Sequence, residues 1–173
     1  QSAGTINRET MRLRNVPIGP PLLFSLVVWS SKKFLLGGMT GEKRQTVTLF
    51  EDRCYPNLMP ISPIITFTSD FGSREHYVGA VKGVLLDACP EATIVDISHE
   101  IASHDLLEAA FIIAACYPFY PSRTVHLVVV DPTVGSARRG IIAITDRGYF
   151  VAPDNGVLSL VYAKEPVRVV AIE

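Results

Sequence analysis

The sequence is most informative at Val125-His126-Leu127-Val128-Val129-Val130, where five of the six residues are aliphatic. Such a near-continuous run is typical of a central strand in a parallel sheet that is covered on both faces. Shorter runs with strand character flank it and are found at 64–68, 93–97, 141–145, 149–152 and 167–172. Asp146-Arg147-Gly148 is a short polar link between two of these runs, so 141–152 is expected to form a hairpin.

Helical stretches alternate with the predicted strands. Apolar residues between Tyr77 and Ala88 recur on one helical face, and Ser73 is the expected N-cap of this helix. Asp105 is expected to cap a second helix, whose 106–115 stretch is apolar nearly all round and therefore buried. A short helix is expected at 157–162. The alternation predicts an α/β fold, with an open, mainly parallel sheet and helices on both faces.

The first 58 residues differ from the rest of the chain. They show no sustained helical or strand period, and prolines and glycines interrupt them. They carry eight Lys and Arg against four Asp and Glu, whereas residues 59–173 carry eight against thirteen. We expect residues 1–58 to be an irregular extension or upstream sequence, with the α/β domain at 59–173 and a native start near Met59. The alternative is a small extension that packs on the domain.

Composition argues against several classes of protein. A formal net charge of −1 gives no indication of a nucleic-acid or anionic-membrane partner. No apolar run approaches the ~20 residues that span a bilayer. Leu22–Trp29 follows two arginines as in a signal peptide, but no clean small-residue cleavage site accompanies it. The three cysteines have no metal-binding spacing, and reduced thiols in a cytoplasmic protein are expected.

Acidic residues follow two of the predicted strands, where open α/β sheets bind ligands. Asp70, within Thr68-Ser69-Asp70-Phe71-Gly72, either accepts hydrogen bonds from a ribose diol or only caps the next turn. Asp131 ends the central run, and arginines follow seven and eight residues later, at 138 and 139. This acid and an arginine either hold a water beside a cleft or form a structural ion pair.

Other polar residues are more ambiguous. Pro153-Asp154-Asn155-Gly156 by itself indicates a turn that leads into a helix. His126 is interpreted as a satisfied sheet residue, whereas His99 or His104 could line a cleft. No histidine has a partner at metal-ligand spacing, and no glycine-rich loop of the dinucleotide or nucleoside-triphosphate type is present.

The order of these motifs resembles the S-adenosylmethionine hydroxide adenosyltransferase family, the adenosine-forming hydrolases whose halide-using relatives are the fluorinases and chlorinases. The resemblance runs from about Ile64 to Glu173. It rests on Thr-Ser-Asp-Phe-Gly at 68–72, Tyr-Val-Gly at 77–79, Ile-Val-Asp-Ile-Ser-His at 94–99, Asp105 with Glu-Ala-Ala at 108–110, Asp-Pro-x-Val-Gly at 131–135 and Pro-Asp-Asn-Gly at 153–156.

The resemblance implies attack of water or hydroxide on the 5′ carbon of the S-adenosylmethionine ribose, which releases methionine and adenosine. Asp70 would bind the ribose hydroxyls, and Asp131 and Arg138 would belong to an Asp/Arg/His set that activates the water. An acid at position 131 favours a hydrolase, since fluorinases lack it and a carboxylate repels a halide. The substrate carries its own leaving group, so no metal or redox cofactor is expected. Further substrate contacts are implied for Phe71, Gly72, His104, Val134 and Asn155.

The chain departs from the family pattern in two ways. Thr133 stands where the hydrolases usually have glycine, which would strain a turn that needs a positive φ. By this resemblance, the family's catalytic histidine and its smaller β-rich C-terminal domain are expected beyond the end of this sequence. In relatives, the site forms between neighbouring subunits of a homotrimer. We therefore expect this chain alone to be incomplete for catalysis, and a non-catalytic nucleoside-binding or trimer-forming module is the alternative.

Overall fold

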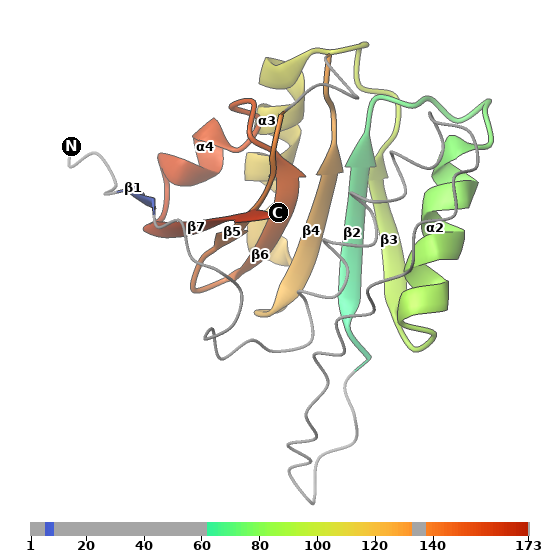
Figure 1. Ribbon diagram of the computed structural model, residues 1–173, viewed down its shortest axis with the longest axis horizontal. Helices are drawn as coiled ribbons and strands as arrows, with labels where there is room; N and C mark the ends of the chain where they lie inside the picture. Colours follow the sequence, from blue (N-terminus) through green and yellow to red (C-terminus); the bar gives the residue numbers. More distant parts are fainter. Residues whose placement is uncertain (1–5, 9–61, 133–137, 173) are drawn as a thin grey trace, which may run out of the picture.

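The computed structural model describes residues 6–8, 62–132 and 138–172. These residues form one seven-stranded sheet of order β1-β7-β5-β6-β4-β2-β3 (Figure 1). The strands are β1 (Ile6–Arg8), β2 (Ile64–Ser69), β3 (Thr93–Ser98), β4 (Thr124–Val129), β5 (Gly140–Ile144), β6 (Gly148–Pro153) and β7 (Val167–Ile172). Every residue of β4 is buried, as its continuous apolar run predicts.

The sheet is mainly parallel. β1 with β7, β2 with β3, β2 with β4, and β4 with β6 all pair in parallel. β5 runs antiparallel to both of its neighbours, β6 and β7. The hairpin predicted for 141–152 is therefore confirmed, and it places one reversed strand inside an otherwise parallel sheet.

Helices cover both faces, which confirms the predicted α/β architecture. On one face, Val81 and Leu85 of α2 (Tyr77–Ala88) pack on alternate residues of β2 and β4, among them Ile65 and Leu127. On the other face lie α3 (Leu106–Cys116), the 3-10 turn η2 (Tyr117–Phe119) and α4 (Ser159–Tyr162). The prediction that the 106–115 helix is buried is wrong for its outer side, where Leu107 and Phe111 are largely exposed because only one side of α3 packs on the sheet. The remaining β4 residues, such as Val128, point into this second core because side chains alternate along a strand.

The two predicted helix caps had different outcomes. Asp105 caps α3, and its carboxylate accepts hydrogen bonds from the N–H groups of Leu107 and Glu108 at 3.0 and 2.9 Å. The prediction for Ser73 is wrong, because α2 begins at Tyr77 and its N-cap position makes no side-chain bond. The chain first leaves the sheet edge in a series of bends, so Ser73 lies too early to reach the first helical N–H groups.

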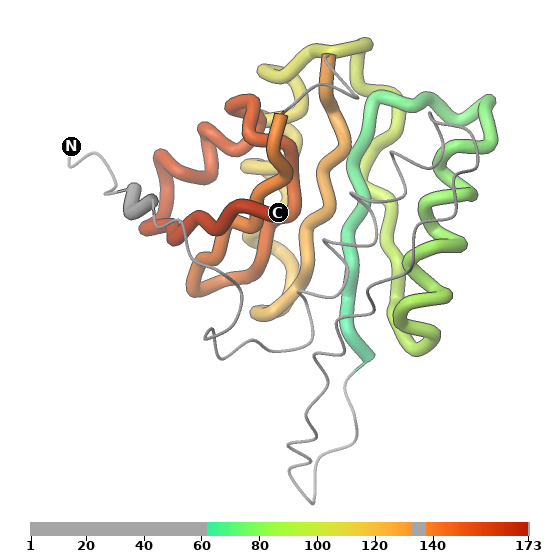
Figure 2. The backbone as a smooth tube through the Cα atoms, viewed as in Figure 1, coloured from blue at the N-terminus to red at the C-terminus, as the bar shows by residue number. Residues whose placement is uncertain are grey.

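The amino-terminal part contributes the edge strand β1, which pairs with β7 from Ile6 opposite Val167 to Arg8 opposite Val169. The sequence did not predict this three-residue strand. The other six strands follow one another along the chain from β2 to β7, as the change of colour from green to red shows (Figure 2). Residues 9–61, with the expected native start near Met59, lie outside the described residues.

The strand order contains a reversal that positions the site. From β2 the chain passes to β3 on one side, and it then crosses back to β4 on the other side of β2. α2 follows β2 on one face of the sheet, whereas α3 follows β3 on the opposite face. Such a reversal is a topological switch point, and ligands bind there, outside the carboxyl ends of the strands.

Candidate functional site

The two candidate carboxylates flank this switch point. Ser69, the last residue of β2, lies opposite Val129, the last residue of β4. Asp70 follows the first strand by one residue, and Asp131 follows the second by two. Neighbouring strands lie about 4.8 Å apart, so both acids stand close together at one edge of the sheet. The pairing of β2 with β4 is what brings the two motifs to the same edge.

Asp131 forms an ion pair that withdraws it from solvent. Its side chain is 2% exposed, and its Oδ1 lies 3.4 Å from Nη1 of Arg138, which is 26% exposed. Burying a carboxylate is costly unless it is paired, and the arginine supplies that partner. A second pair, Arg139 with Asp154 at 3.7 Å, lies nearer the solvent, with 60% and 30% of the side chains exposed.

Asn155 joins the same edge from the end of β6. Its side-chain N–H donates to the Val130 carbonyl over 2.8 Å, and its carbonyl oxygen accepts from the Val157 N–H over 3.1 Å. The side chain therefore ties the 153–156 turn to the residue that precedes Asp131. The structure gives Asn155 this holding role, which the sequence did not reveal.

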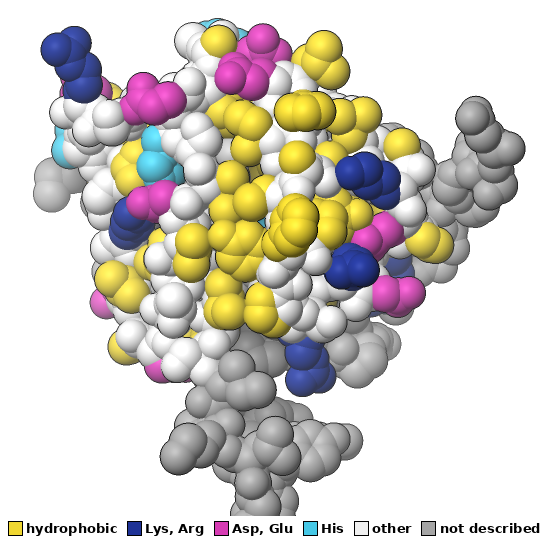
Figure 3. All heavy atoms as spheres, turned by 180° about the vertical axis from the view of Figure 1, so that it is seen from behind, with side chains coloured by type: hydrophobic (Ala, Val, Ile, Leu, Met, Phe, Trp, Pro, Cys, Tyr) yellow, Lys and Arg dark blue, Asp and Glu magenta, His cyan; other side chains and the backbone are white. Residues whose placement is uncertain are grey.

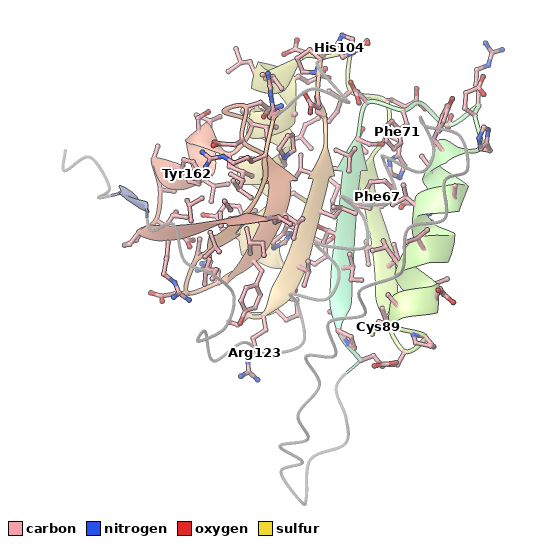
Figure 4. The ribbon with its side chains drawn as sticks, viewed as in Figure 1. Phe67, Phe71, Cys89, His104, Arg123 and Tyr162 are labelled. Carbon is pink, nitrogen blue, oxygen red and sulfur yellow. The ribbon has the colours of Figure 1, made fainter. Side chains whose placement is uncertain are left out.

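Asp70 accepts a hydrogen bond from the backbone of His104. The His104 N–H donates to Asp70 Oδ2 over 3.1 Å, and His104 has a φ of +65°. Non-glycine residues seldom adopt this conformation, and those that do are often found at functional sites. The His104 side chain is exposed and lies at the outer end of the sheet (Figure 4). Oδ1 of Asp70 and the second lone pair of Oδ2 can still receive hydroxyl groups.

Three further residues were predicted to contact the substrate: Phe71, Gly72 and Val134. The Phe71 ring packs against Phe67 with centroids 6.4 Å apart and against Tyr77 at 5.9 Å, so it belongs to the α2 side (Figure 4). Gly72 has a φ of +70°, a left-handed conformation that glycine adopts without strain. Thr133 and Val134 lie outside the described residues.

Sequence reasoning missed a polar chain beside Asp70. Ser69 Oγ lies 2.8 Å from Nδ1 of His99, and His99 Nε2 lies 3.1 Å from Oδ1 of Asp96. Asp96 also binds Nζ of Lys82 on α2. Burial acts to raise the Asp96 pKa, but the Lys82 ammonium and the His99 ring beside the carboxylate prevail and lower it. One sequence signal could have indicated this contact: Ser69 ends β2 and His99 directly follows β3, the strand that pairs with β2.

We also searched the described residues for other cavities, metal sites and membrane-spanning helices. A small hollow under α3 is lined by Thr66, Thr68, Cys116, Tyr117 and His126 among others, and it has room for about one water molecule. No group of three or more potential ligands for a metal ion occurs among the described residues. No helix in the described part of the chain is long and apolar enough to cross a membrane.

Comparison with known proteins gives one consistent family. Residues 65–173 match the family described as the SAM hydroxide adenosyltransferase N-terminal domain. An (R)-S-adenosyl-L-methionine hydrolase from Methanocaldococcus jannaschii is 42% identical over 113 residues, which cover 62% of this chain and 43% of that protein. A fluorinase from Actinoplanes sp. is 38% identical over 80 residues, which cover 46% of this chain and 27% of that protein.

A solved structure agrees with the fold. An uncharacterized conserved protein from Thermotoga maritima superposes with a TM-score of 0.62 at 40% identity, covering 63% of this chain and 43% of that one. The chain thus spans less than half the length of the relatives it matches.

Proposed function

This chain belongs to the SAM hydroxide adenosyltransferase family through its N-terminal domain, and on that premise we propose that it supplies one half of a site that hydrolyses S-adenosylmethionine. In the reaction, a water oxygen bonds to the ribose 5′ carbon while the bond from that carbon to sulfur breaks. The electron pair leaves with the sulfur, so the products are methionine and adenosine. A proton from the attacking water is released to a nearby base.

The observation that carries the proposal is the buried Asp131–Arg138 pair at the switch point. A carboxylate at this position can accept a hydrogen from the attacking water and orient its lone pair toward carbon. The guanidinium 3.4 Å away pairs with this carboxylate and limits its rotation. Alignment of the two reactants removes much of the entropic cost of the reaction.

The same pair favours water over halide as the nucleophile. A halide ion beside the Asp131 carboxylate would be repelled, and the buried position weakens screening by solvent. The nearby arginine already has this carboxylate as its partner. Water carries no charge and can donate to the carboxylate, so we assign the domain to the hydrolases of its family.

Asp70 is proposed to bind the ribose. Its carboxylate lies across the switch point from Asp131, and its oxygens retain acceptor capacity beyond the His104 N–H. A ribose held there would present its 5′ carbon toward the neighbouring strand end. Since the sulfonium is itself the leaving group, we propose that cleavage proceeds without a metal or redox cofactor.

We also propose that the complete protein is a cytoplasmic homotrimer with no nucleic-acid or membrane partner. Hydrophobic side chains gather on the α3 face of the molecule (Figure 3), where Leu107, Phe111 and Phe119 are 73%, 66% and 87% exposed. Apolar surface of this kind supports contact with another subunit. Sedimentation of the complete protein, with Phe111→Ser as the variant, tests this: trimers that persist unchanged would exclude the α3 face.

The function is tested by incubating S-adenosylmethionine with this chain and with a version extended by the remaining half of the Methanocaldococcus relative. Chromatography would detect adenosine and methionine. We expect turnover in the extended protein and little in the chain alone, because the chain spans under half of its relatives. Adenosine binding without turnover in both would instead indicate a nucleoside-binding module.

Two variants of the extended protein separate the assigned roles. Asp131→Asn removes the buried carboxylate charge and should lower turnover by about 100-fold or more, since general-base contributions are typically of that size. Asp154→Asn removes the more exposed acid of the second pair and should leave turnover within about threefold. Equal losses in the two variants would contradict the role of Asp131.

A further inference from the structure

The Ser69–His99–Asp96 chain resembles a nucleophilic triad in its composition, but burial excludes that role. Ser69 is 0% exposed, and its Oγ lies between His99 Nδ1 at 2.8 Å and the Phe71 N–H at 3.5 Å. A nucleophile must reach its substrate, and this hydroxyl reaches only the protein. The role of Ser69, His99 and Asp96 is therefore to be found in the protein segments that they contact.

The groups that face the two ring nitrogens of His99 decide which nitrogen carries the hydrogen. Asp96 only accepts, so the His99 nitrogen that faces it, Nε2, carries the hydrogen at 3.1 Å. The contact is poorly directed, since Nε2 has no partner that meets hydrogen-bond geometry. In the neutral ring, Nδ1 is then the acceptor, and the Ser69 hydroxyl donates to it. The Ser69 oxygen is left to accept from the Phe71 N–H.

These bonds hold the residues on both sides of Asp70. The imidazole of His99 fixes Ser69, which precedes Asp70, while the His99 carbonyl accepts from the Gly72 N–H over 2.7 Å. Phe67 packs on the His99 ring at a centroid distance of 4.7 Å and limits its rotation. One histidine therefore sets the path of the whole 69–72 turn.

We propose that His99, acting through Ser69, is a positioning residue that aims the Asp70 carboxylate at the ribose. The identity of the ligand rests on the proposed function, whereas the control of the turn rests on the contacts alone. His99 does not touch the ligand in this scheme. Its effect reaches the site through the backbone of residues 69–72.

The structure offers a matched control within the same strand. Thr66 Oγ1 lies 2.8 Å from Nδ1 of His126, which is the same kind of bond at the same length, but inside the core. Thr66→Val and Ser69→Ala each remove one buried hydroxyl that binds a histidine. Both should lower the urea midpoint by comparable amounts, and only Ser69→Ala should loosen the turn beside Asp70.

The probe is adenosine, titrated calorimetrically into the extended protein of the turnover experiment, because this chain supplies only one half of the proposed site. We expect Ser69→Ala to weaken its affinity by about tenfold, the usual scale for one lost buried hydrogen bond, and Thr66→Val to leave it unchanged. His99→Phe should weaken it similarly, whereas His99→Asn, which keeps an acceptor near the Nδ1 position, should recover most of it. Unchanged affinity in Ser69→Ala, or an equal loss in Thr66→Val, would overturn the proposal.

A second measurement separates this inference from the proposed function. Hydrogen exchange of the Gly72 amide reports on its bond to His99 whether or not a ligand binds. Ser69→Ala should speed that exchange by about tenfold relative to β4 amides, and Thr66→Val should not. If wild type fails to bind adenosine but Gly72 responds, the proposed function fails and the positioning role stands. If Gly72 does not respond, the positioning role fails.

Discussion

Two histidines in this domain make the same bond and have different consequences. His126 and His99 each place Nδ1 2.8 Å from a hydroxyl on β2, at Thr66 and Ser69 respectively. His126 lies in the middle of the sheet, 4% exposed, and stacks on Phe150 at 4.8 Å. His99 lies beyond a strand end, where Asp96 and the 69–72 turn surround it. Position along the strand, rather than residue type, separates a core histidine from one beside a site.

The largest expected effect comes from the core histidine's surroundings. Phe150→Ala removes a fully buried ring that stacks on His126 and contacts Tyr117, and it should lower the free energy of unfolding by about 3–5 kcal/mol. Phe71→Ala, at the half-buried turn beside His99, should cost clearly less. Urea denaturation at pH 7 measures both, and an equal loss would show that the two regions contribute alike to stability.

An intermediate effect follows from the titration of His126. Burial lowers its pKa from 6.5 to about 4, so between these values the unfolded chain binds the proton and the folded chain does not. Stability should therefore fall as the pH falls from about 6.5 to about 4, by roughly 2 kcal/mol between pH 7 and pH 5. The difference in unfolding free energy between wild type and His126→Gln at the two pH values isolates this contribution. A difference that does not change with pH would refute it.

The smallest effect is expected at the outer end of the His99 chain. Lys82→Ala removes the ion pair with Asp96, whose two side chains are 33% and 41% exposed. Solvent screens such pairs, so the free energy of unfolding should change by no more than about 0.5 kcal/mol. Thermal denaturation in low and high salt checks this, and a loss above about 1 kcal/mol would mean that the charged end is structurally important.

The sequence predicted the elements of the fold well where local physics decides them. The continuous apolar run of β4, the β5–β6 hairpin and the Asp105 cap all depend on residues close in sequence. Ser73 failed as a cap because the exit from the sheet edge is longer than the helix pattern indicates. The pairing of β1 with β7 could not be predicted, since three residues join a partner about 160 positions away.

The candidate site was predictable to a similar degree. Asp70 and Asp131 could each be singled out because ligands bind beyond the strand ends of open α/β sheets, whereas their proximity follows from the pairing of β2 with β4. The His99–Ser69 bond and the Asn155 bond to Val130 link residues from separate motifs. Their geometry depends on strand register and on a bulge between Phe67 and Thr68, which no single motif encodes.

The reversed direction of β5 also bears on how this site could be redesigned. β4 and β6 are parallel, and β5 is antiparallel to β6. The chain therefore leaves β4 and enters β5 at the same edge of the sheet. Asp131 and Arg138 therefore sit at the two ends of a single connection that starts and finishes on fixed strands. Any redesign that preserves the register of β4, β6 and β5 therefore keeps both members of this ion pair at the same edge of the sheet.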